Sequence, residues 1–361
     1  MHAPVRILLA LAAVSGVAGC QTIGPGSVQR DRLDYAAAIA DSWKEQALLN
    51  IIKLRYFDTP VFLDVASVIS SYTLQSQIDI AAQAYPYSLP SASAQSNRRL
   101  GVTGTYIDRP TISYAPLTGE KYVNNLLRPI PPQAIFAMIQ AGHQADYIFD
   151  AAVRAINDVY NYSASPARAR REDPTFRLVT RAFRRIQQAG ALGMRIEKRG
   201  GAEATLIFFR ENAGQDVAKD IRSLKEALGI GPDKKEMSLA FGSLRHSDDE
   251  IALLTRSMME MLVEFSADIE VPRQHLLEGR ARAAPEPVAT ASPGETRLVR
   301  IHSGSEPPPD AYAAVRYRNY WFWIDDQDLD SKRAFLFLRI FSSIAETGAV
   351  PQIPIITIPA N

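Results

Sequence analysis

The 361-residue sequence is poor in cysteine and histidine and has no surplus of either charge. Its single cysteine excludes a disulfide within the chain. Forty Lys and Arg residues face 39 Asp and Glu residues, for a formal net charge of +1, so the basic surplus of a dedicated nucleic-acid binder is missing. Mean hydropathy is −0.10, and no apolar run approaches the ~20 residues of a membrane-spanning helix. A polytopic helical membrane protein is therefore excluded.

The sequence also lacks the usual signatures of catalysis and metal binding. It contains no H-E-x-x-H, C-x-x-C, G-x-S-x-G or P-loop pattern, and His143, His246, His275 and His302 fall in four separate segments. His143 and Asp146 stand three residues apart in a predicted helix and form a candidate pair of metal ligands, although a surface or capping role is favoured. We therefore predict no catalytic residue, no cofactor and no metal.

What the sequence does contain begins with a signal peptide. Arg6 precedes an apolar stretch over residues 7–14, which small residues end, as is typical of secretory signals. The residues Val17-Ala18-Gly19-Cys20 resemble a bacterial lipobox, although Leu is commoner than Val at the first position. This resemblance covers only the N-terminus, and the mature chain resembles no characterised family.

The lipobox resemblance implies a cellular location. It implies removal of residues 1–19 and attachment of two or three acyl chains, palmitate among them, at Cys20. Gln21 follows the cysteine where lipoproteins kept in the inner membrane often carry Asp, so sorting to the outer membrane is favoured. We expect an outer-membrane lipoprotein that faces the periplasm.

The mature sequence predicts an α+β fold in two domains. Residues 20–34, rich in Gly and polar side chains, predict a lipidated tether. Residues 35–165 predict an N-terminal helix from an Asp34 N-cap to near Phe57, a long antiparallel β-hairpin and a second helix. Residues 166–361 predict a C-terminal α+β sandwich with a disordered insertion at 280–295.

The hairpin is the most distinctive pattern in the chain. Residues 71–84 and 100–114 alternate between apolar even-numbered and polar odd-numbered positions. Packing on the protein's own helices is the favoured interpretation. The alternatives are a docking edge and insertion into a membrane, which requires an oligomer that contributes several hairpins because lipid cannot satisfy unpaired strand edges.

Helices and strands of the second half follow from periodicity, caps and turns. Pro132 is placed to open one helix, and Ser247 with Glu250 matches the S-x-x-E capping box for another. The helices are predicted at 133–160, 174–189, 215–228, 248–266 and 329–346. The strands are predicted at 193–198, 203–209, 236–241, 296–302, 312–317 and 320–324.

Three clusters are candidate binding sites. Arginines crowd residues 168–185, and an anionic envelope partner could contact Arg177, Arg181, Arg184 and Arg185, although a solvated helix face is favoured. The acidic run 325–330 suits helix capping better than calcium. Aromatic residues at 317–323 suit cross-strand packing better than a glycan or protein interface.

The sequence thus favours a lipid-anchored envelope protein with a non-catalytic assembly, scaffold or transport-accessory role. The expected partners are the membrane, through the N-terminal lipid, and either an envelope protein or other copies of the chain, with no nucleic acid. Two alternatives stay open: an envelope hydrolase or transferase without a recognisable motif, and a periplasmic module that binds glycan or lipid.

Overall fold

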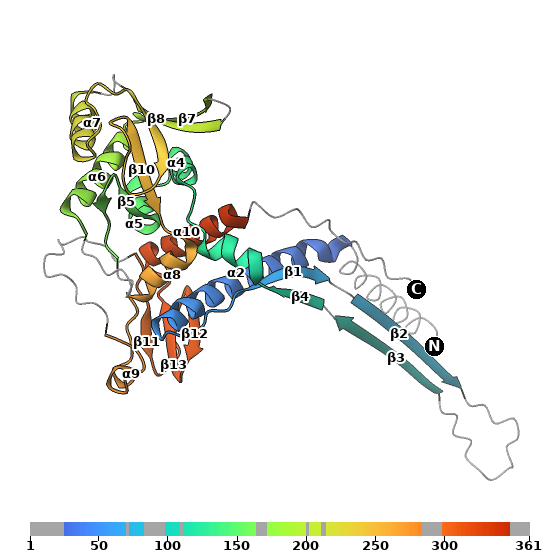
Figure 1. Cartoon of the computed structure of the whole chain (residues 1–361). Coiled ribbons are helices and arrows are strands. Elements are labelled where there is room, and N and C mark those ends of the chain that lie inside the picture. Colours follow the sequence, from blue (N-terminus) through green and yellow to red (C-terminus); the bar gives the residue numbers. More distant parts are fainter. Residues whose placement is uncertain are drawn as a thin grey trace, which may run out of the picture. The chain divides into compact units, whose positions relative to one another are not determined.

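The computed structural model describes residues 25–69, 72–82, 98–108, 111–163, 172–199, 202–210, 214–283 and 298–346, and shows the predicted mixture of helices and sheets (Figure 1). The chain divides into two compact units. The main unit comprises residues 1–61 and 118–361, and the ribbon unit comprises residues 62–117. The predicted signal peptide and Cys20 lie outside the described residues, as does most of the predicted insertion at 280–295.

A six-stranded sheet forms one half of the main unit, in the order β6-β5-β10-β9-β8-β7. Neighbouring strands run antiparallel except β9 and β10, which are parallel. The strands are β5 (Val153–Ile156), β6 (Val159–Tyr160), β7 (Leu192–Arg199), β8 (Ala202–Phe209), β9 (Glu236–Phe241) and β10 (Glu250–Thr255). The helices packed around them are α4 (Pro132–Gln140), α5 (Ala145–Ala152), α6 (Pro174–Gln188) and α7 (Gln215–Ala227).

Aromatic side chains fill the interior between these helices and the sheet. Phe136, Phe149 and Phe183 are fully buried, and their ring centroids lie 5.0 to 6.0 Å apart. The apolar stripe of α6 supplies Phe183 because its hydrophobic residues recur every three or four positions, while its arginines occupy the opposite side. This half of the unit therefore has a core of closely packed aromatic side chains.

The other half of the main unit is mostly helical. A three-stranded sheet in the order β11-β13-β12 accompanies the long helix α2. The elements are α2 (Pro25–Arg55), α3 (Gly119–Tyr122), the π-helix η2 (Val123–Leu127), α8 (Met258–Ser266), α9 (Arg273–Leu277), β11 (His302–Gly304), β12 (Ala313–Tyr317), β13 (Tyr320–Ile324) and α10 (Leu329–Glu346). Leu48, Ile51 and Ile52 bury the C-terminal half of α2, which contacts α8 and β12.

Several local predictions are confirmed. Strand β9 and helix α10 have the predicted bounds. Arg318 and Asn319 adopt φ angles of 46° and 70° and close the β12–β13 hairpin with a two-residue turn. The Asp328 carboxylate accepts a hydrogen bond from the Ser331 backbone N–H at 3.1 Å, so the acidic run does cap α10.

Two predicted helices are wrong. The helix expected at 133–160 ends at Gln140, because Gly142 takes a φ of 98°, and α5 is followed by strands β5 and β6. The helix expected at 248–266 is instead strand β10 followed by α8, and the capping box of α8 is Ser257 with Glu260. The short apolar run at 251–253 fits a buried strand as well as a helix, and pairing with β9 decides between them.

Three boundaries also move. Helix α2 begins at Pro25 rather than after Asp34, so residues 25–34 of the expected tether are helical. The strand expected at 296–302 is not formed at residues 298–301, and β11 instead covers residues 302–304. The domain boundary expected near residue 165 falls inside the main unit, because β5, which precedes it, pairs with β10, which follows it.

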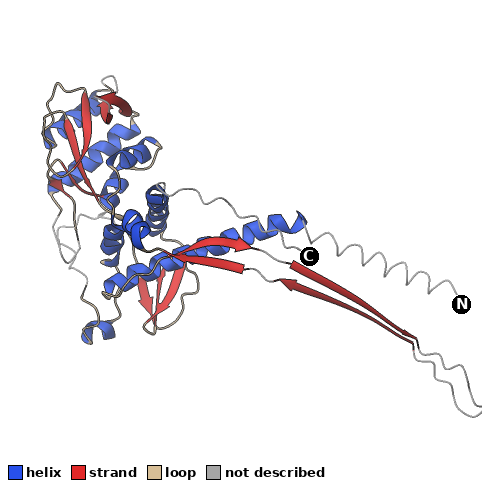
Figure 2. Cartoon of the chain, turned by 45° about the vertical axis from the view of Figure 1, so that its right-hand side comes forward, coloured by secondary structure: helices blue, strands red, loops and turns tan. Residues whose placement is uncertain are grey.

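The ribbon unit consists of two antiparallel strand pairs, drawn in red in Figure 2. Strand β1 (Leu63–Ile69) pairs with β4 (Thr111–Pro116), and β2 (Tyr72–Ala82) pairs with β3 (Arg98–Asp108). The predicted hairpin pairing is therefore confirmed, although the alternating runs are divided between four strands.

Among the described residues, no helix has both the length and the apolar character needed to cross a membrane.

Candidate interaction surface on the β-ribbon

The β1–β4 pair has one apolar and one polar face. In the register, Val65 stands opposite Tyr114 and Val68 opposite Ile112. Ala66 is an extra residue, a β-bulge, between these two pairs. Residues directly opposite each other in an antiparallel pair share a face. The bulge therefore brings Leu63 and Val65, at odd positions, onto the same face as Val68, Ile112 and Tyr114.

The opposite face of the same pair is mainly polar. Asp64 stands opposite Ala115, Ser67 opposite Ser113 and Ile69 opposite Thr111. Without the bulge, the odd-numbered residues Leu63 and Val65 would lie on this polar face, because a shift of one residue reverses every side chain of a strand. The bulge thus keeps one apolar face continuous along β1.

The apolar face of β1 and β4 is in large part exposed to solvent. Leu63, Ile112 and Tyr114 remain 43%, 42% and 58% exposed. A two-stranded ribbon alone is marginally stable in water, because it has no core and leaves both strand edges unpaired. Clustered exposed apolar residues of this kind are typical of surfaces that bind a protein or a membrane.

The β2–β3 pair continues the alternation in a regular register. Even-numbered residues always stand opposite even-numbered ones, and odd opposite odd. Ile78, for example, stands opposite Val102, and Gln77 opposite Thr103. No bulge interrupts the pairing from Tyr72 to Ala82. Even-numbered positions of both strands therefore share one face of the ribbon, as the sequence predicts.

Hydrogen bonds and an ion pair fix the last residues of the main unit before the ribbon unit begins at residue 62. The Asn50 side chain accepts from the Val61 N–H at 2.9 Å and donates to the Val61 carbonyl at 2.8 Å. Arg318 pairs with Asp58 at 2.8 Å. Asn50 was not singled out in the sequence, since an asparagine inside a helix gives no signal of a partner eleven residues away.

Tyr56 belongs to the same network. Its hydroxyl lies 2.7 Å from Nδ1 of the buried His275. Burial raises the pKa of Tyr56 to about 12, and burial lowers the pKa of His275. Both groups are therefore neutral near pH 7, and they share a hydrogen bond whose direction follows the tautomer of His275.

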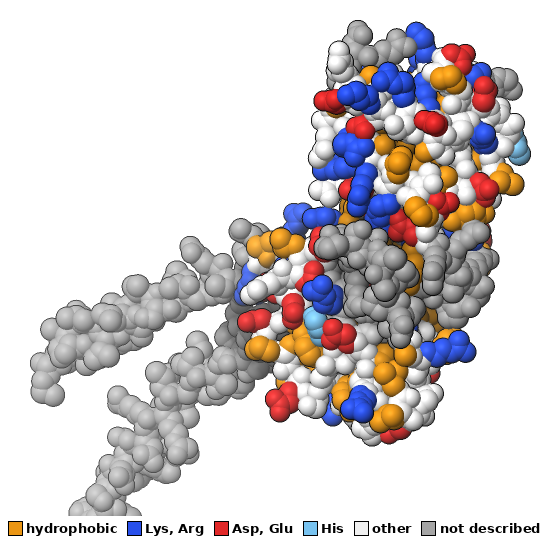
Figure 3. Space-filling model, turned by 90° about the vertical axis from the view of Figure 1, so that its left-hand side faces the viewer, with side chains coloured by type: hydrophobic (Ala, Val, Ile, Leu, Met, Phe, Trp, Pro, Cys, Tyr) orange, Lys and Arg blue, Asp and Glu red, His pale blue; other side chains and the backbone are white. Residues whose placement is uncertain are grey.

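Three of the four candidate arginines on α6 already have a carboxylate partner inside the chain. Arg177 pairs with Asp150 at 2.7 Å and with Glu172 at 2.6 Å. Arg184 lies 4.0 Å from Asp146 and Arg185 2.6 Å from Asp220. Arg181 is exposed and makes no ion pair with any described residue. On the face shown in Figure 3, Asp and Glu side chains accordingly lie among the Lys and Arg side chains. Contact with an anionic partner stays a prediction.

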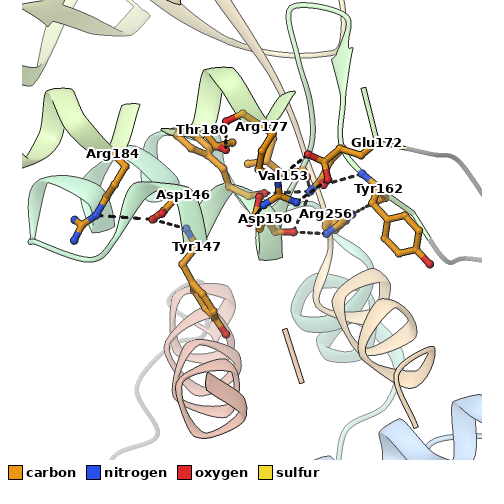
Figure 4. Close-up of polar contacts among 12 residues, drawn as sticks. Asp146, Tyr147, Asp150, Val153, Tyr162, Glu172, Arg177, Thr180, Arg184 and Arg256 are labelled. Atoms are coloured by element: carbon orange, nitrogen blue, oxygen red, sulfur yellow. Dashed lines mark hydrogen bonds and ion pairs between the residues drawn. The ribbon is translucent and has the colours of Figure 1, made fainter. Parts of the chain in front are cut away.

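Arg177 is part of a cluster of charged residues that joins α5 to its neighbours (Figure 4). Burial raises the pKa of Asp150 to about 6, although Arg177 opposes the shift. Asp150 Oδ1 is buried and has no hydrogen-bond partner among the described residues. The cluster therefore holds a carboxylate whose pKa is raised by burial, beside the Arg177 guanidinium, which pairs with both Asp150 and Glu172.

Arg256 lies fully buried behind this cluster, at the C-terminal end of α5. Its guanidinium donates to the carbonyls of Asp150 at 2.8 Å, Ala151 at 3.1 Å and Tyr162. A cation there satisfies carbonyls that the helix leaves unpaired and complements its dipole. The role of Arg256 is thus to cap α5. Only the tertiary fold reveals it, because Arg256 is more than 90 residues from Asp150 and Tyr162 in sequence.

The histidines and aromatic residues that the sequence singled out contact other side chains of the main unit. His143 lies before α5 and packs against Phe337, while Asp146 faces Arg184, so they do not form an i, i+3 pair within one helix. His302 lies 3.0 Å from Glu270 and 3.4 Å from Asp325. The described residues contain no cluster of three or more His, Cys, Asp or Glu side chains suited to a metal.

The aromatic cluster packs between strands and against the end of α2. Phe322 is fully buried, and Tyr56 contacts both Phe322 and Tyr317 edge to face. The Tyr317 hydroxyl also donates to Asp58. The favoured packing interpretation of residues 317–323 is confirmed for these side chains.

No family model, curated protein or solved structure matches the chain. Evidence for its function therefore comes from the arrangement of its own residues. The feature that points most directly to a binding partner is the set of exposed apolar side chains on β1 and β4.

Proposed function

We propose that this chain is a lipid-anchored protein of the bacterial outer membrane, facing the periplasm, with a non-catalytic role in assembly or transport. In this proposal several copies associate through the ribbon unit. Cys20 carries the acyl chains and residues 1–19 are removed. The lipobox resemblance supports the anchor, and the ribbon supports the assembly.

The apolar face of β1 and β4 carries the proposal. Val68 and Ile112 are opposite each other on that face, and Ile112 is 42% exposed. Burying such side chains against another copy contributes about 25 cal/mol for each Å² of apolar surface removed from water. Pairing of strand edges between copies would also satisfy the backbone groups that a lone ribbon leaves to solvent.

The test compares the two faces of the ribbon in the full-length protein extracted from host membranes in mild detergent. We expect an oligomer by light scattering coupled to size exclusion. The double variant Val68→Asp with Ile112→Asp should reduce it to monomer. The matched control, Ser67→Asp with Ser113→Asp, places the same charges on the polar face of neighbouring residue pairs and should keep the oligomer.

Two results would contradict the assembly role. One is a monomeric wild-type protein at every concentration tested. The other is equal behaviour of the two double variants, because charge on the polar face should be tolerated. Circular dichroism of each variant checks that the main unit remains folded.

The anchor is tested separately by mass spectrometry of the mature N-terminus. We expect Cys20 as the first residue with acyl chains attached, and we expect a Cys20→Ser precursor to remain uncleaved by the lipoprotein peptidase. An unmodified Cys20 or an intact Met1 in host membranes would refute the anchor without affecting the assembly role.

A further inference from the structure

The length of β2 and β3 matches the hydrocarbon core of a bilayer. Each strand contains 11 residues, and all 11 pairs are formed in one regular register. A tilted membrane strand needs ~9 to 11 residues. Strands in globular proteins more commonly have ~5 to 6 residues, so this pair is long for a ribbon that ends in water.

The sequence along this register is two-faced. The even-numbered face is mainly apolar, with Leu74, Ile78, Ile80, Leu100, Val102 and Tyr106, and Ser76 stands opposite Gly104 near its middle. The odd-numbered face is mainly polar, with Thr73, Gln75, Gln77, Asp79, Thr103 and Thr105, and its larger apolar residue, Ile107, lies near one end. Strands that separate lipid from water alternate in this way, apolar toward lipid and polar toward water.

Charged residues are confined to the ends of the even-numbered face. Asp108 stands opposite Tyr72 at one end, and Arg98 stands opposite Ala82 at the other. Between these two end pairs, every even-numbered residue of β2 and β3 is uncharged. A charge near the bilayer midplane costs several kcal/mol, whereas a charge at the headgroups costs little, so this distribution suits a segment that crosses an apolar layer.

From these observations we propose that β2 and β3 enter the lipid bilayer, with the even-numbered face against acyl chains and the odd-numbered face against water. The inference rests on the proposed function, because a lone ribbon would leave two edges of unpaired N–H and C=O groups in lipid. Ribbons of neighbouring copies, joined edge to edge, supply the missing partners. The occupant of this face is thus lipid, whereas the partner at each edge is another copy of the chain.

The test uses full-length protein, acylated at Cys20, in phosphatidylethanolamine and phosphatidylglycerol vesicles. A polarity-sensitive dye is attached to single cysteines at two pairs of register partners. Ile78→Cys and Val102→Cys place it on the even face, and Gln77→Cys and Thr103→Cys on the odd face. The unsubstituted protein, whose only cysteine is Cys20, gives the labelling background. Nitroxides on the acyl chains and iodide in the water serve as the two quenchers.

We expect acyl-chain nitroxides to quench the dye at positions 78 and 102, and iodide to quench it at positions 77 and 103. Iodide quenching at all four positions would overturn the inference. So would protection of positions 78 and 102 from both quenchers, because that pattern means protein contact instead of lipid.

Chemical cross-linking of the same vesicles separates this inference from the proposed function. Cross-linked oligomers without acyl-chain quenching leave the assembly role standing and refute insertion. Monomers alone refute the assembly role. Acyl-chain quenching in monomers also contradicts the inference, because the inference requires neighbouring copies to pair the strand edges in lipid.

Discussion

The main unit and the ribbon unit use apolar residues in opposite ways. In the main unit, Phe149 and Phe183 are fully buried between helices and the six-stranded sheet. In the ribbon unit, Ile112 and Tyr114 are 42% and 58% exposed on a two-stranded sheet. Helical periodicity in the main unit predicts an apolar face that is buried in a core. Strand alternation in the ribbon unit predicts an apolar face whose side chains are exposed. A pattern identifies which residues avoid water, but it does not identify what covers them.

The largest expected difference between the units is in amide hydrogen exchange. In protein diluted to monomer, amides of β8 should exchange only through global unfolding, whose free energy is about 5–15 kcal/mol for a typical domain. Amides of β1 and β4 should exchange with protection near zero, because no packed layer holds the pair together. Mass spectrometry of peptic fragments measures both. Comparable protection in the two units of the monomer would mean that the ribbon is stable by itself.

A truncation in each unit sharpens the comparison. Phe183→Ala should lower the free energy of unfolding by about 3–5 kcal/mol, since it opens a cavity among buried rings. Ile112→Ala should lower that of the monomer by less than about 0.5 kcal/mol, because its side chain is exposed. Urea denaturation followed by circular dichroism provides the values. Equal losses would show that Ile112 is buried by contacts within the monomer.

Ion pairs of the main unit have a smaller expected effect. Arg177→Gln should cost about 2–3 kcal/mol of unfolding free energy, because it leaves the partly buried Asp150 carboxylate without its cation. Arg181→Gln is the matched control on the same helix and should change stability by less than about 0.5 kcal/mol. If Arg181→Gln were the more harmful, the assignment of the internal partners of α6 would be wrong.

The smallest effect is a dependence on pH that belongs to the main unit. Burial raises the pKa of Asp150 from 3.8 to about 6 on folding, so the folded protein binds a proton that the unfolded chain has released. Its stabilising contribution is complete below pH ~4 and is lost as the pH rises to about 6, and amounts to less than ~3 kcal/mol. Asp150→Asn should remove this slope between pH 4 and 6.

Asp146→Asn is the control for that titration, because Asp146 lies on the same helix and is more exposed. Urea midpoints measured at several pH values should fall between pH 4 and 6 relative to those of the Asp150→Asn variant. An identical slope in the wild type and Asp150→Asn would show that Asp150 titrates normally in the folded protein.

Local rules predicted those elements whose ends and faces depend on near neighbours in sequence. Helix α10 begins beside its Asp328 cap, and the β12–β13 hairpin turns at residues that tolerate positive φ. The even-to-even pairing of β2 with β3 follows from alternation, since only this parity brings the two apolar sets onto one face. These features need no information from distant parts of the chain.

Long-range pairing decided what local rules left ambiguous. Residues 247–250 match an S-x-x-E helix start, yet Glu250 and the residues that follow form strand β10, which pairs in parallel with β9. Three of the four candidate arginines of α6 pair with carboxylates up to 38 residues away, which no local pattern indicates. The sequence therefore predicted which helix has the arginines, but it did not predict that carboxylates of the same chain pair with three of them.

By itself, the sequence determined that this is an α+β chain with a two-faced hairpin, because side-chain periodicity reflects backbone geometry residue by residue. Only the tertiary structure decided that β5 pairs with β10 across the expected domain boundary, and that Arg256 caps α5. It also decided that Leu63, Ile112 and Tyr114 of β1 and β4 are exposed. Burial and pairing depend on which distant segments meet, and that choice is made by the free energy of the whole chain rather than by any one segment.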